Sequence, residues 1–415
     1  MREMKDSGIS WVGEIPKEWS VNRAKYCFVN TKEIAGCRSD RYERLALTMN
    51  GVIKRSKDDS NGLQPEKFET YQILRPDELV FKLIDLQNVS TSRVGLSPYL
   101  GLVSPAYIIL KSNKRVLPAF AEKYFLMLWK NQIFNALGDA GVRSNLNSKD
   151  LLELSIPFPS LAEQQRIAEF LDRECGKIDG LKADIQAQID TLEQYKRSII
   201  TEAVTHGLNP SAPMKDSGIP WGGKTPEYWK VGRIGGLYEL RNQKVSDKDF
   251  MPLSVTMKGI LPQLETAAKT NDGDNRKLVR VGDFAINSRS DRRGSCGISD
   301  YDGSVSLINT ILKPRNRMNV KYYNWLFHTP MFADEFYKWG HGIVDDLWTT
   351  NWSEMKRISI PLPPLDEQQE IADYLDHKCA AIEQIIADKK SQIETLDGYK
   401  KSLIYEYVTG KKEVV

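Results

Sequence analysis

Apolar residues recur at intervals of seven along two long segments of the chain. In the first segment they are Leu171, Ile178, Ile185, Leu192 and Ile199, with Leu181, Ile189 and Tyr195 near a complementary line. The second segment has Leu375, Ile382, Leu396 and Leu403, with Ile385, Ile393 and Tyr399, and Lys389 takes one of the apolar places. A sustained heptad pattern predicts a coiled-coil helix. We therefore predict two long helices, over residues 160–206 and 364–410.

These helical segments belong to an internal repeat. Residues 4–11 and 214–221 share seven of eight positions, and residues 155–172 and 359–376 share twelve of eighteen. Self-similarity at this level indicates two copies of one structural unit. Each copy consists of a short motif, a variable globular segment and a long helix. The expected globular domains are 1–159 and 207–363.

Both variable segments are predicted to mix helices and strands. Short β-branched runs at 106–110 and 309–312 are typical of strands. Aromatic-rich segments over 119–137 and 320–339 are typical of helices. The fold class is therefore α+β: two mixed α/β domains joined by two long helices, with a pseudo-two-fold axis relating the copies.

The lengths of the parts predict how the helices pair. A helix of roughly 45 residues is about 65 Å long, whereas a 155-residue globule is roughly 40 Å across. Parallel pairing would require the second globule to return the chain along a whole helix length, which is beyond its reach. We therefore expect an antiparallel coiled coil with one globule at each end. An ordinary core helix or a homodimer zipper is the alternative, but the chain itself supplies two matching segments.

Composition narrows the class of protein only modestly. Hydrophobic residues make up 41% and charged residues 27% of the chain, and the net charge is +3. No apolar run is long enough for a membrane span and the start is polar, so we expect a cytoplasmic protein without a membrane anchor. The five cysteines include no Cys-x-x-Cys pair, which argues against a disulfide framework or a zinc site.

Motifs of catalysis are weak or missing. Residues 218–225 satisfy the Gly-x4-Gly-Lys-Thr pattern, but no apolar strand precedes them and Pro226 follows at once, whereas a phosphate-binding loop needs a strand before it and a helix after it. The four histidines are scattered. No Asn-Pro-Pro-aromatic or Asp-Pro-Pro-aromatic tetrapeptide occurs. We expect no catalytic residue and no metal site.

Basic and amide side chains cluster instead within the variable segments. Arginine can bind guanine or phosphate, and Asn and Gln can pair with adenine edges. The candidate DNA-binding residues of the first domain are Lys54, Arg55, Lys82, Gln87, Asn88, Arg93, Arg143 and Asn145. Those of the second are Lys258, Asn287, Arg289, Arg292 and Arg293. For each set, a solvated surface loop is the alternative interpretation.

Two repeated motifs carry a resemblance to a known family. Lys-Asp-Ser-Gly-Ile-x-Trp precedes each globular segment, and Ile-Pro-x-Pro-x-Leu-x-Glu-Gln-Gln-x-Ile-Ala precedes each helix. In this order the chain resembles the specificity subunit of type I restriction–modification systems. The resemblance implies two target-recognition domains, each recognising one half of a bipartite double-stranded DNA site. It also implies helices that set the gap between the halves.

The same resemblance implies partners and excludes cofactors in this chain. Two methyltransferase (modification) subunits would dock on the helical part, and restriction/translocase subunits would join that complex. S-adenosylmethionine, ATP and Mg²⁺ would be used by the partner subunits and none by this one.

Two other classes remain as alternatives. A stand-alone DNA methyltransferase or nuclease would turn over S-adenosylmethionine or ATP without partners. A protein-binding coiled-coil scaffold would bind no duplex, whereas specific DNA binding falls with salt and survives for one bipartite sequence.

Overall fold

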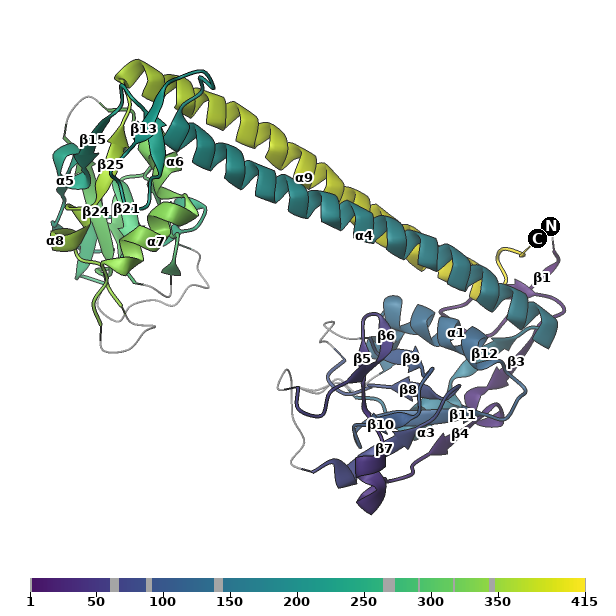
Figure 1. Ribbon diagram of the computed structural model, residues 1–415. Coiled ribbons are helices and arrows are strands. Elements are labelled where there is room, and N and C mark those ends of the chain that lie inside the picture. Colours follow the sequence, from purple (N-terminus) through teal and green to yellow (C-terminus); the bar gives the residue numbers. More distant parts are fainter. Residues whose placement is uncertain are drawn as a thin grey trace. The chain divides into compact units, whose positions relative to one another are not determined.

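The computed structural model describes residues 2–59, 67–86, 92–137, 145–263, 273–289, 292–315, 318–342 and 348–414. The chain forms two compact units, each of which is described by itself (Figure 1). Unit 1 contains Met1–Ile185 and Lys390–Val415, and unit 2 contains Gln186–Lys389. Each unit therefore combines one globular lobe with half of each long helix.

The two long helices are α4 (Leu161–His206) and α9 (Leu365–Val408), and they run antiparallel in each unit (Figure 1). In unit 1, Lys400 of α9 pairs with Asp179 of α4 at 2.7 Å, and Asp397 pairs with Lys182 at 2.5 Å. In unit 2, Lys196 of α4 pairs with Glu383 of α9. Because residue numbers rise on one helix as they fall on the other, the predicted antiparallel pairing is confirmed.

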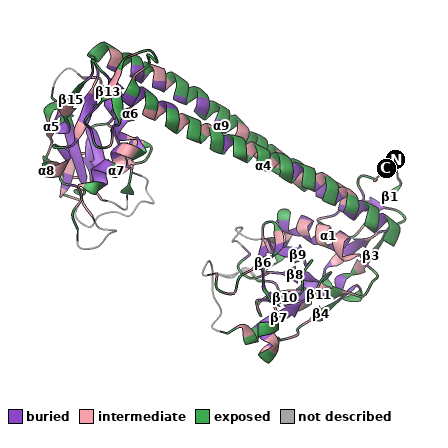
Figure 2. Ribbon diagram, in the orientation of Figure 1, coloured by how far each residue is buried: buried purple, intermediate pink, exposed green. Residues whose placement is uncertain are grey.

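Burial along the helices agrees with one of the two expected apolar lines and corrects the other (Figure 2). Leu171, Ile178, Ile199, Leu375, Ile382 and Leu403 are buried, and Ile185, Leu192 and Leu396 are half-buried. The expected complementary positions Leu181, Tyr195, Ile385 and Tyr399 are instead 45–56% exposed, although Ile189 is buried.

The second interface line keeps Ile189 and Ile393 and otherwise lies one residue beyond the expected positions. Interface spacings alternate between four and three residues, so the line on α4 is Cys175, Lys182, Ile189, Lys196 and Ala203. The matching line on α9 is Cys379, Ile386, Ile393 and Lys400. Lysines were missed as interface residues because their apolar stems can lie along an interface while the ammonium group reaches a partner outside it.

Unit 1 builds its lobe from two four-stranded sheets. One has the order β4 (Phe28–Thr31), β11 (Ile108–Ser112), β8 (Leu79–Phe81), β9 (Val94–Leu96). The other has the order β6 (Gly51–Arg55), β5 (Arg44–Thr48), β10 (Gly101–Val103), β7 (Gln72–Leu74). Two small ladders are β1 (Met4–Asp6) with β2 (Glu14–Pro16), and β3 (Ser20–Arg23) with β12 (Ser155–Phe158).

Helices of this lobe are short apart from α1. They are α1 (Pro118–Lys130), α2 (Ile133–Leu137), α3 (Ser148–Glu153), and the 3₁₀ turns η1 (Ala24–Tyr26), η2 (Gly36–Arg41) and η3 (Phe68–Thr70). Helix α1 buries an aromatic face against the first sheet, where the Phe125 and Phe81 rings are 5.0 Å apart. The helix expected over 119–137 is broken, because Gln132 adopts a φ of 59°.

The lobe of unit 2 repeats this architecture. Its main sheet has the order β16 (Tyr238–Leu240), β24 (Asn309–Pro314), β21 (Phe284–Asn287), β22 (Cys296–Ile298), which matches β4-β11-β8-β9 element by element. The remaining ladders are β17 (Lys244–Val245), β20 (Arg276–Val279) and β23 (Gly303–Val305); β18 (Leu253–Thr256) with β19 (Gly259–Pro262); β13 (Met214–Asp216) with β14 (Lys224–Pro226); and β15 (Lys230–Arg233) with β25 (Ser359–Leu362). The duplication seen in the sequence is therefore a duplication of fold.

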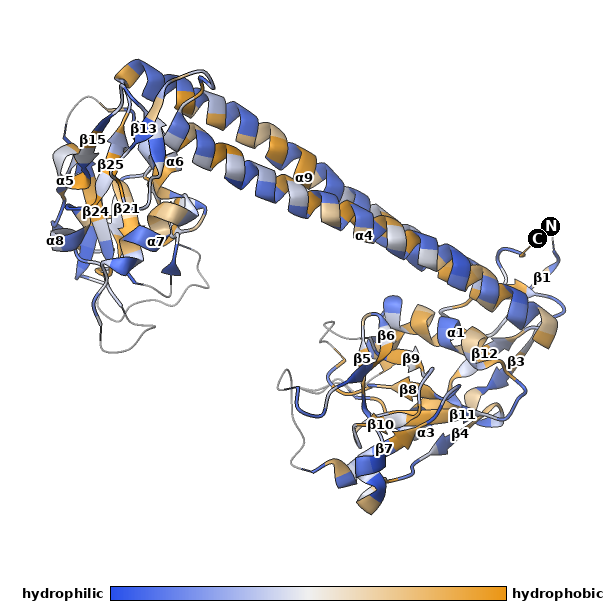
Figure 3. Ribbon diagram, in the orientation of Figure 1, coloured by the Kyte–Doolittle hydropathy of each residue, from blue (hydrophilic) through white to orange (hydrophobic). Residues whose placement is uncertain are grey.

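The helices of unit 2 are α5 (Ile234–Leu237), α6 (Val320–Phe327), α7 (Pro330–Lys338) and α8 (Trp352–Met355). The helix expected over 320–339 is divided, because Thr329 caps α7 and Pro330 starts it. In both lobes the hydrophobic residues concentrate on the sheets, whereas hydrophilic and hydrophobic residues alternate along α4 and α9 (Figure 3). The α+β class is confirmed.

The repeated motifs attach each lobe to the start of its helix. The Trp19 indole N–H donates to Glu163 at 3.0 Å, and the Trp229 indole N–H donates to Glu367 at 2.8 Å. The next residue, Gln164 or Gln368, accepts from the N-cap amide of α1 or α6 and donates to the carbonyl of Pro159 or Pro363. The Glu-Gln-Gln motif thus provides buried polar contacts between helix and lobe.

The phosphate-loop pattern at 218–225 forms a turn and not a nucleotide site. Lys224 begins strand β14, which pairs with β13 and ends at Pro226. Gly223 has a φ of 59°, which suits a glycine in the connecting turn. The pattern therefore connects the two strands of a hairpin and is followed by strand β15, whereas a phosphate-binding loop leads into a helix.

Candidate DNA-recognition surfaces

A polar cleft in unit 2 brings together most of the candidate residues of the second domain. It has a volume of about 640 Å³ and lies between the β18–β19 hairpin and the segment that follows β21. Asn287, Arg292 and Arg293 line it, and Lys258 occupies the tip of the hairpin. Three arginines and no acidic side chain line the cleft among the residues that the structure describes.

The floor of this cleft is held by a buried arginine that the sequence analysis missed. Arg276 of β20 is 4% exposed and donates to the Ser304 hydroxyl at 2.9 Å and to the Ser304 carbonyl at 3.0 Å. Burial lowers the pKa of Arg276. Arg276 lies in a short strand of ordinary composition, so no sequence signal separated it from a surface residue.

The rim of the cleft is positioned by helix α7. The Tyr337 hydroxyl donates to the Arg292 carbonyl at 3.3 Å, and the Arg293 guanidinium lies 5.8 Å from the Tyr337 ring centroid. Arg293 also forms an ion pair with Asp334. Both arginines remain exposed. Helix α7 thus holds the rim in place through Tyr337 and Asp334. The rim presents two exposed guanidinium groups.

Two other candidates in this lobe have local structural contacts. Asn287 is 6% exposed, and its side-chain oxygen accepts from the Arg289 amide at 3.1 Å. Arg289 in turn forms a β-bridge with Thr349. The side-chain oxygen of Asn287 is therefore occupied by the backbone amide of Arg289, so this oxygen supports the local backbone.

In unit 1, Lys54 and Arg55 border a cleft of about 440 Å³ whose charges are mixed. Lys54 pairs with Glu43 at 2.6 Å, and this contact raises the pKa of Lys54. Arg55 pairs with Asp59 at 3.1 Å. Both side chains lie on strand β6, and each is paired with a carboxylate. This pairing weakens the attraction that each cation would exert on a phosphate.

Arg93 corrects an expectation of the sequence analysis. Arg93 is fully buried, and its guanidinium donates a hydrogen bond to the Asp85 carbonyl at 2.5 Å. The guanidinium is therefore not presented to DNA in this structure. Burial, followed by the Arg93 charge, lowers the pKa of Lys82. Asn145 accepts from the Asp85 amide at 3.0 Å. These residues hold the turn after β8. Gln87, Asn88 and Arg143 lie outside the described residues.

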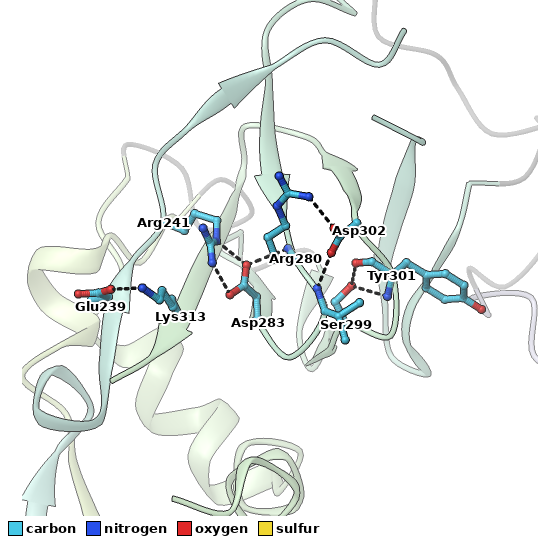
Figure 4. Close-up of polar contacts among 9 residues, drawn as sticks. Glu239, Arg241, Arg280, Asp283, Ser299, Tyr301, Asp302 and Lys313 are labelled. Atoms are coloured by element: carbon cyan, nitrogen blue, oxygen red, sulfur yellow. Dashed lines mark hydrogen bonds and ion pairs between the residues drawn. The ribbon is translucent and has the colours of Figure 1, made fainter. Parts of the chain in front are cut away.

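A charged network on unit 2 was also missed by the sequence analysis (Figure 4). Arg241 binds Asp283 through two hydrogen bonds of 2.5 and 3.0 Å, and the Arg280 amide donates to the same carboxylate at 2.9 Å. Arg280 also binds Asp302 at 2.5 Å, and the Val281 amide, then Arg280, lower the pKa of Asp302. Each arginine in this network is paired with a carboxylate, so the network does not form a phosphate site. Its hydrogen bonds connect neighbouring turns of the lobe.

Neither a metal centre nor a membrane segment emerges from the described ranges. No group of three or more His, Cys, Asp or Glu side chains there could hold a metal ion. Within the same ranges, no helix is both long and apolar enough to cross a membrane.

Comparison with known proteins assigns the family. The model of the type I restriction modification DNA specificity domain matches residues 57–191 and 226–395, one match for each copy of the repeat. The chain belongs to this family of DNA specificity domains.

Relatives match most of the length of the chain. It is 24% identical to the putative type I restriction enzyme MjaX specificity subunit of Methanocaldococcus jannaschii, over 97% of this chain and 96% of that protein. It is 20% identical to the type I restriction enzyme EcoKI specificity subunit of Escherichia coli K12, over 85% and 81%. A solved chain from work on complex assembly and conformational transition of the type I R-M system has a similar fold, with a TM-score of 0.69 at 14% identity, over 96% and 99%.

Proposed function

We propose that this chain is the DNA specificity subunit of a type I restriction–modification complex and that each lobe recognises one half of a bipartite duplex site. The family assignment covers both lobes, whose main sheets have the same strand order while their sequences diverge between the repeated motifs. Two similar but unequal lobes suit two unequal half-sites. The observation that carries the proposal is the unit 2 cleft, whose lining gathers Arg276, Arg292 and Arg293, the last of which also pairs with Asp334 on α7.

The chemistry of this cleft fits a duplex better than a small ligand. Exposed guanidinium groups of Arg292 and Arg293 can donate in pairs to guanine O6 and N7 or to phosphate oxygens. Lys258 at the hairpin tip is a flexible cation of the kind that contacts phosphates.

A paired substitution tests the modular part of the proposal. Arg292→Ala with Arg293→Ala should weaken binding of the cognate duplex by about ten-fold or more and relax one half-site, because each lost base contact is worth about 1–3 kcal/mol. The matched control is Lys230→Ala, an exposed cation on β15 outside the cleft. Binding to duplexes altered in one half-site at a time is the measurement. Equal relaxation of both halves would contradict modular recognition.

We further propose that two methyltransferase subunits dock on the helix pair. In unit 1, Leu181 and Tyr399 are exposed and directly precede the interface residues Lys182 and Lys400. Since the helices are antiparallel, the two side chains project from the same side of the pair. In unit 2, Tyr195 and Ile385 repeat the arrangement. Two equivalent apolar patches suit two copies of one partner.

Substitutions on this side of the helix pair test the docking proposal. Leu181→Glu and Ile385→Glu should each remove one methyltransferase subunit from the assembly, and the double variant should remove both. Native mass spectrometry of the co-expressed subunits gives the stoichiometry. Exposed Glu193→Gln on α4 is the control. Full assembly of the double variant would exclude this side.

The remaining parts of the proposal concern chemistry outside this chain. S-adenosylmethionine, ATP and Mg²⁺ serve the methyltransferase and restriction/translocase partners, and the complex works in the cytoplasm. The purified chain should turn over neither S-adenosylmethionine nor ATP. Turnover by the chain without partners would instead favour a stand-alone enzyme.

A further inference from the structure

Both lobes carry the same short hairpin with a methionine at its tip. In unit 1, Thr48 pairs with Gly51 across β5 and β6, and in unit 2, Thr256 pairs with Gly259 across β18 and β19. The threonine hydroxyl donates to the glycine carbonyl at 3.0 Å in one lobe and 2.9 Å in the other. It also accepts from the amide of Asn50 at 3.2 Å or Lys258 at 3.1 Å.

Backbone geometry does not require methionine at this place. The turn depends on the threonine hydroxyl and on the glycine, which has a φ of 89° at Gly51 and 100° at Gly259. Methionine adds no burial, because Met49 is 50% exposed and Met257 is 71% exposed. A single exposed apolar residue is ordinary. Two exposed methionines at equivalent hairpin tips of otherwise divergent lobes are not explained by the needs of folding.

Each tip borders a cleft that contains cationic side chains. Met257 lines the unit 2 cleft together with Arg292 and Arg293. Met49 lines a separate cleft of unit 1, of about 970 Å³, where lysines such as Lys130 and Lys401 alternate with carboxylates such as Asp179 and Asp397. The unit 2 tip therefore combines a flexible apolar side chain with groups that bind phosphate, and the unit 1 tip places the same apolar side chain beside a cleft of mixed charge.

We propose that Met257 and Met49 are apolar wedges that insert between adjacent base pairs of the two half-sites. This inference rests on the proposed function and adds a mode of recognition to it. Methionine is among the side chains that unstack a base step and kink a duplex, while nearby cations hold the flanking phosphates. The hairpin supplies the stiff support, because its tip is closed by two hydrogen bonds besides the ladder.

The wedge makes each half-site dependent on deformability as well as on base contacts. Pyrimidine–purine steps such as TA and CA unstack most easily. A step of this kind is therefore expected at one fixed position in each half-site.

Fluorescence of a base analogue tests the proposal directly. The probe is the duplex that the wild-type full-length chain selects from a random-sequence pool, with 2-aminopurine placed at each pyrimidine–purine step in turn. Wild-type binding should raise the fluorescence at one step in each half-site, because unstacking relieves quenching. Met257→Ala should abolish the rise in one half and weaken binding about ten-fold, and Met49→Ala should do the same in the other half.

Two control variants separate a wedge from general weakening. Met257→Leu, which keeps the apolar volume, should retain both the affinity and the fluorescence rise. Lys258→Ala should reduce the slope of binding against salt by about one and leave the fluorescence rise intact. Unchanged thermal unfolding of every variant establishes that the exposed substitutions leave the fold in place.

The outcomes distinguish this inference from the proposed function. A wild-type chain that selects no sequence contradicts both. Selective binding without a fluorescence rise at any step, or with Met257→Ala equal to wild type, overturns the wedge and leaves the specificity function standing. Loss of the rise in Met257→Leu as in Met257→Ala also overturns it.

Discussion

Buried glutamines connect each lobe to the beginning of its helix. Gln164 is fully buried, accepts from the Leu117 amide at 2.8 Å and donates to the Pro159 carbonyl at 3.0 Å. Gln368 makes the same contacts with Asn319 and Pro363, at 2.9 Å each. Leu117 and Asn319 are the N-cap residues of α1 and α6. One side chain thus satisfies two backbone groups in each copy.

We expect Gln164→Ala to lower the stability of unit 1 by about 2–5 kcal/mol, because it leaves two buried backbone groups without their partner. Hydrogen exchange should accelerate at the first turn of α1 and much less in α6. Gln368→Ala should give the reverse pattern. The control is Gln165→Ala, whose exposed amide donates to Glu169. Protection of α1 that survives in Gln164→Ala would contradict this assignment.

Cysteine reactivity provides a second test at the residue scale. Burial raises the pKa of Cys27, Cys175 and Cys296, and raises that of Cys379 to about 11. Thiols with raised pKa values stay protonated and inaccessible near pH 8, so they react slowly. Cys37 is exposed. Iodoacetamide should therefore label the native chain at Cys37 first, and rapid labelling at Cys296 would be inconsistent with the described core. Unfolded chain provides the control, with five labels.

At the scale of elements, lysines determine how α4 and α9 pair. Lys196–Glu383 and Lys400–Asp179 are equivalent under the internal repeat, because both residue numbers shift by 204. Lys182–Asp397 has no equivalent, since Ile386 occupies the repeated position of Lys182. Charged residues at an interface specify register at a cost in stability. The heptad pattern alone therefore predicted a helix pair but placed part of its second line wrongly.

Lys389 offers the clearest substitution in the helix pair. It is half-buried and donates to Gln188 at 2.5 Å, whereas its repeat counterpart is Ile185. Lys389→Ile should raise the stability of the helix pair by about 1 kcal/mol, because the interface layer becomes apolar. Lys390→Ile, at an exposed neighbouring position, should have no such effect. Urea unfolding followed by far-UV circular dichroism makes the comparison, and equal midpoints for Lys389→Ile and wild type would refute it.

Helix existence was easier to predict than helix continuity. The aromatic periodicity over 119–137 and 320–339 does correspond to helices in both lobes. Each segment nevertheless divides in two, at Gln132 and at Thr329–Pro330, because a positive φ or an N-cap interrupts the hydrogen-bond ladder. Hydrophobic periodicity indicates which face of a helix is buried. It does not detect a single residue whose backbone conformation departs from the helix.

At the scale of the whole molecule, the repeat and the helices predict a spacing function. The helices carry equivalent sequences in an antiparallel pair, so equal insertions in both preserve the interface. Seven residues added after Ala187 and after Ser391 should lengthen the pair by about 10 Å. The gap between half-sites should then grow by about three base pairs.

Methylation mapping with a library of gap lengths measures this spacing. An insertion in α4 alone is the control, because it shifts one helix against the other and should impair assembly. An unchanged preferred gap in the double insertion would exclude the helices as the element that sets the distance.

Local pattern by itself determined the duplication, the two long helices, their antiparallel pairing and the absence of a convincing nucleotide loop. These follow from periodicity, repeated motifs and segment lengths, all of which can be counted along the chain without knowledge of distances in space. Tertiary structure alone decided which cations face solvent. It buried Arg93, used Asn287 as a support, and gathered Arg276, Arg292 and Arg293 around one cleft. Such grouping depends on contacts between residues far apart in sequence, and a linear pattern does not encode their distances.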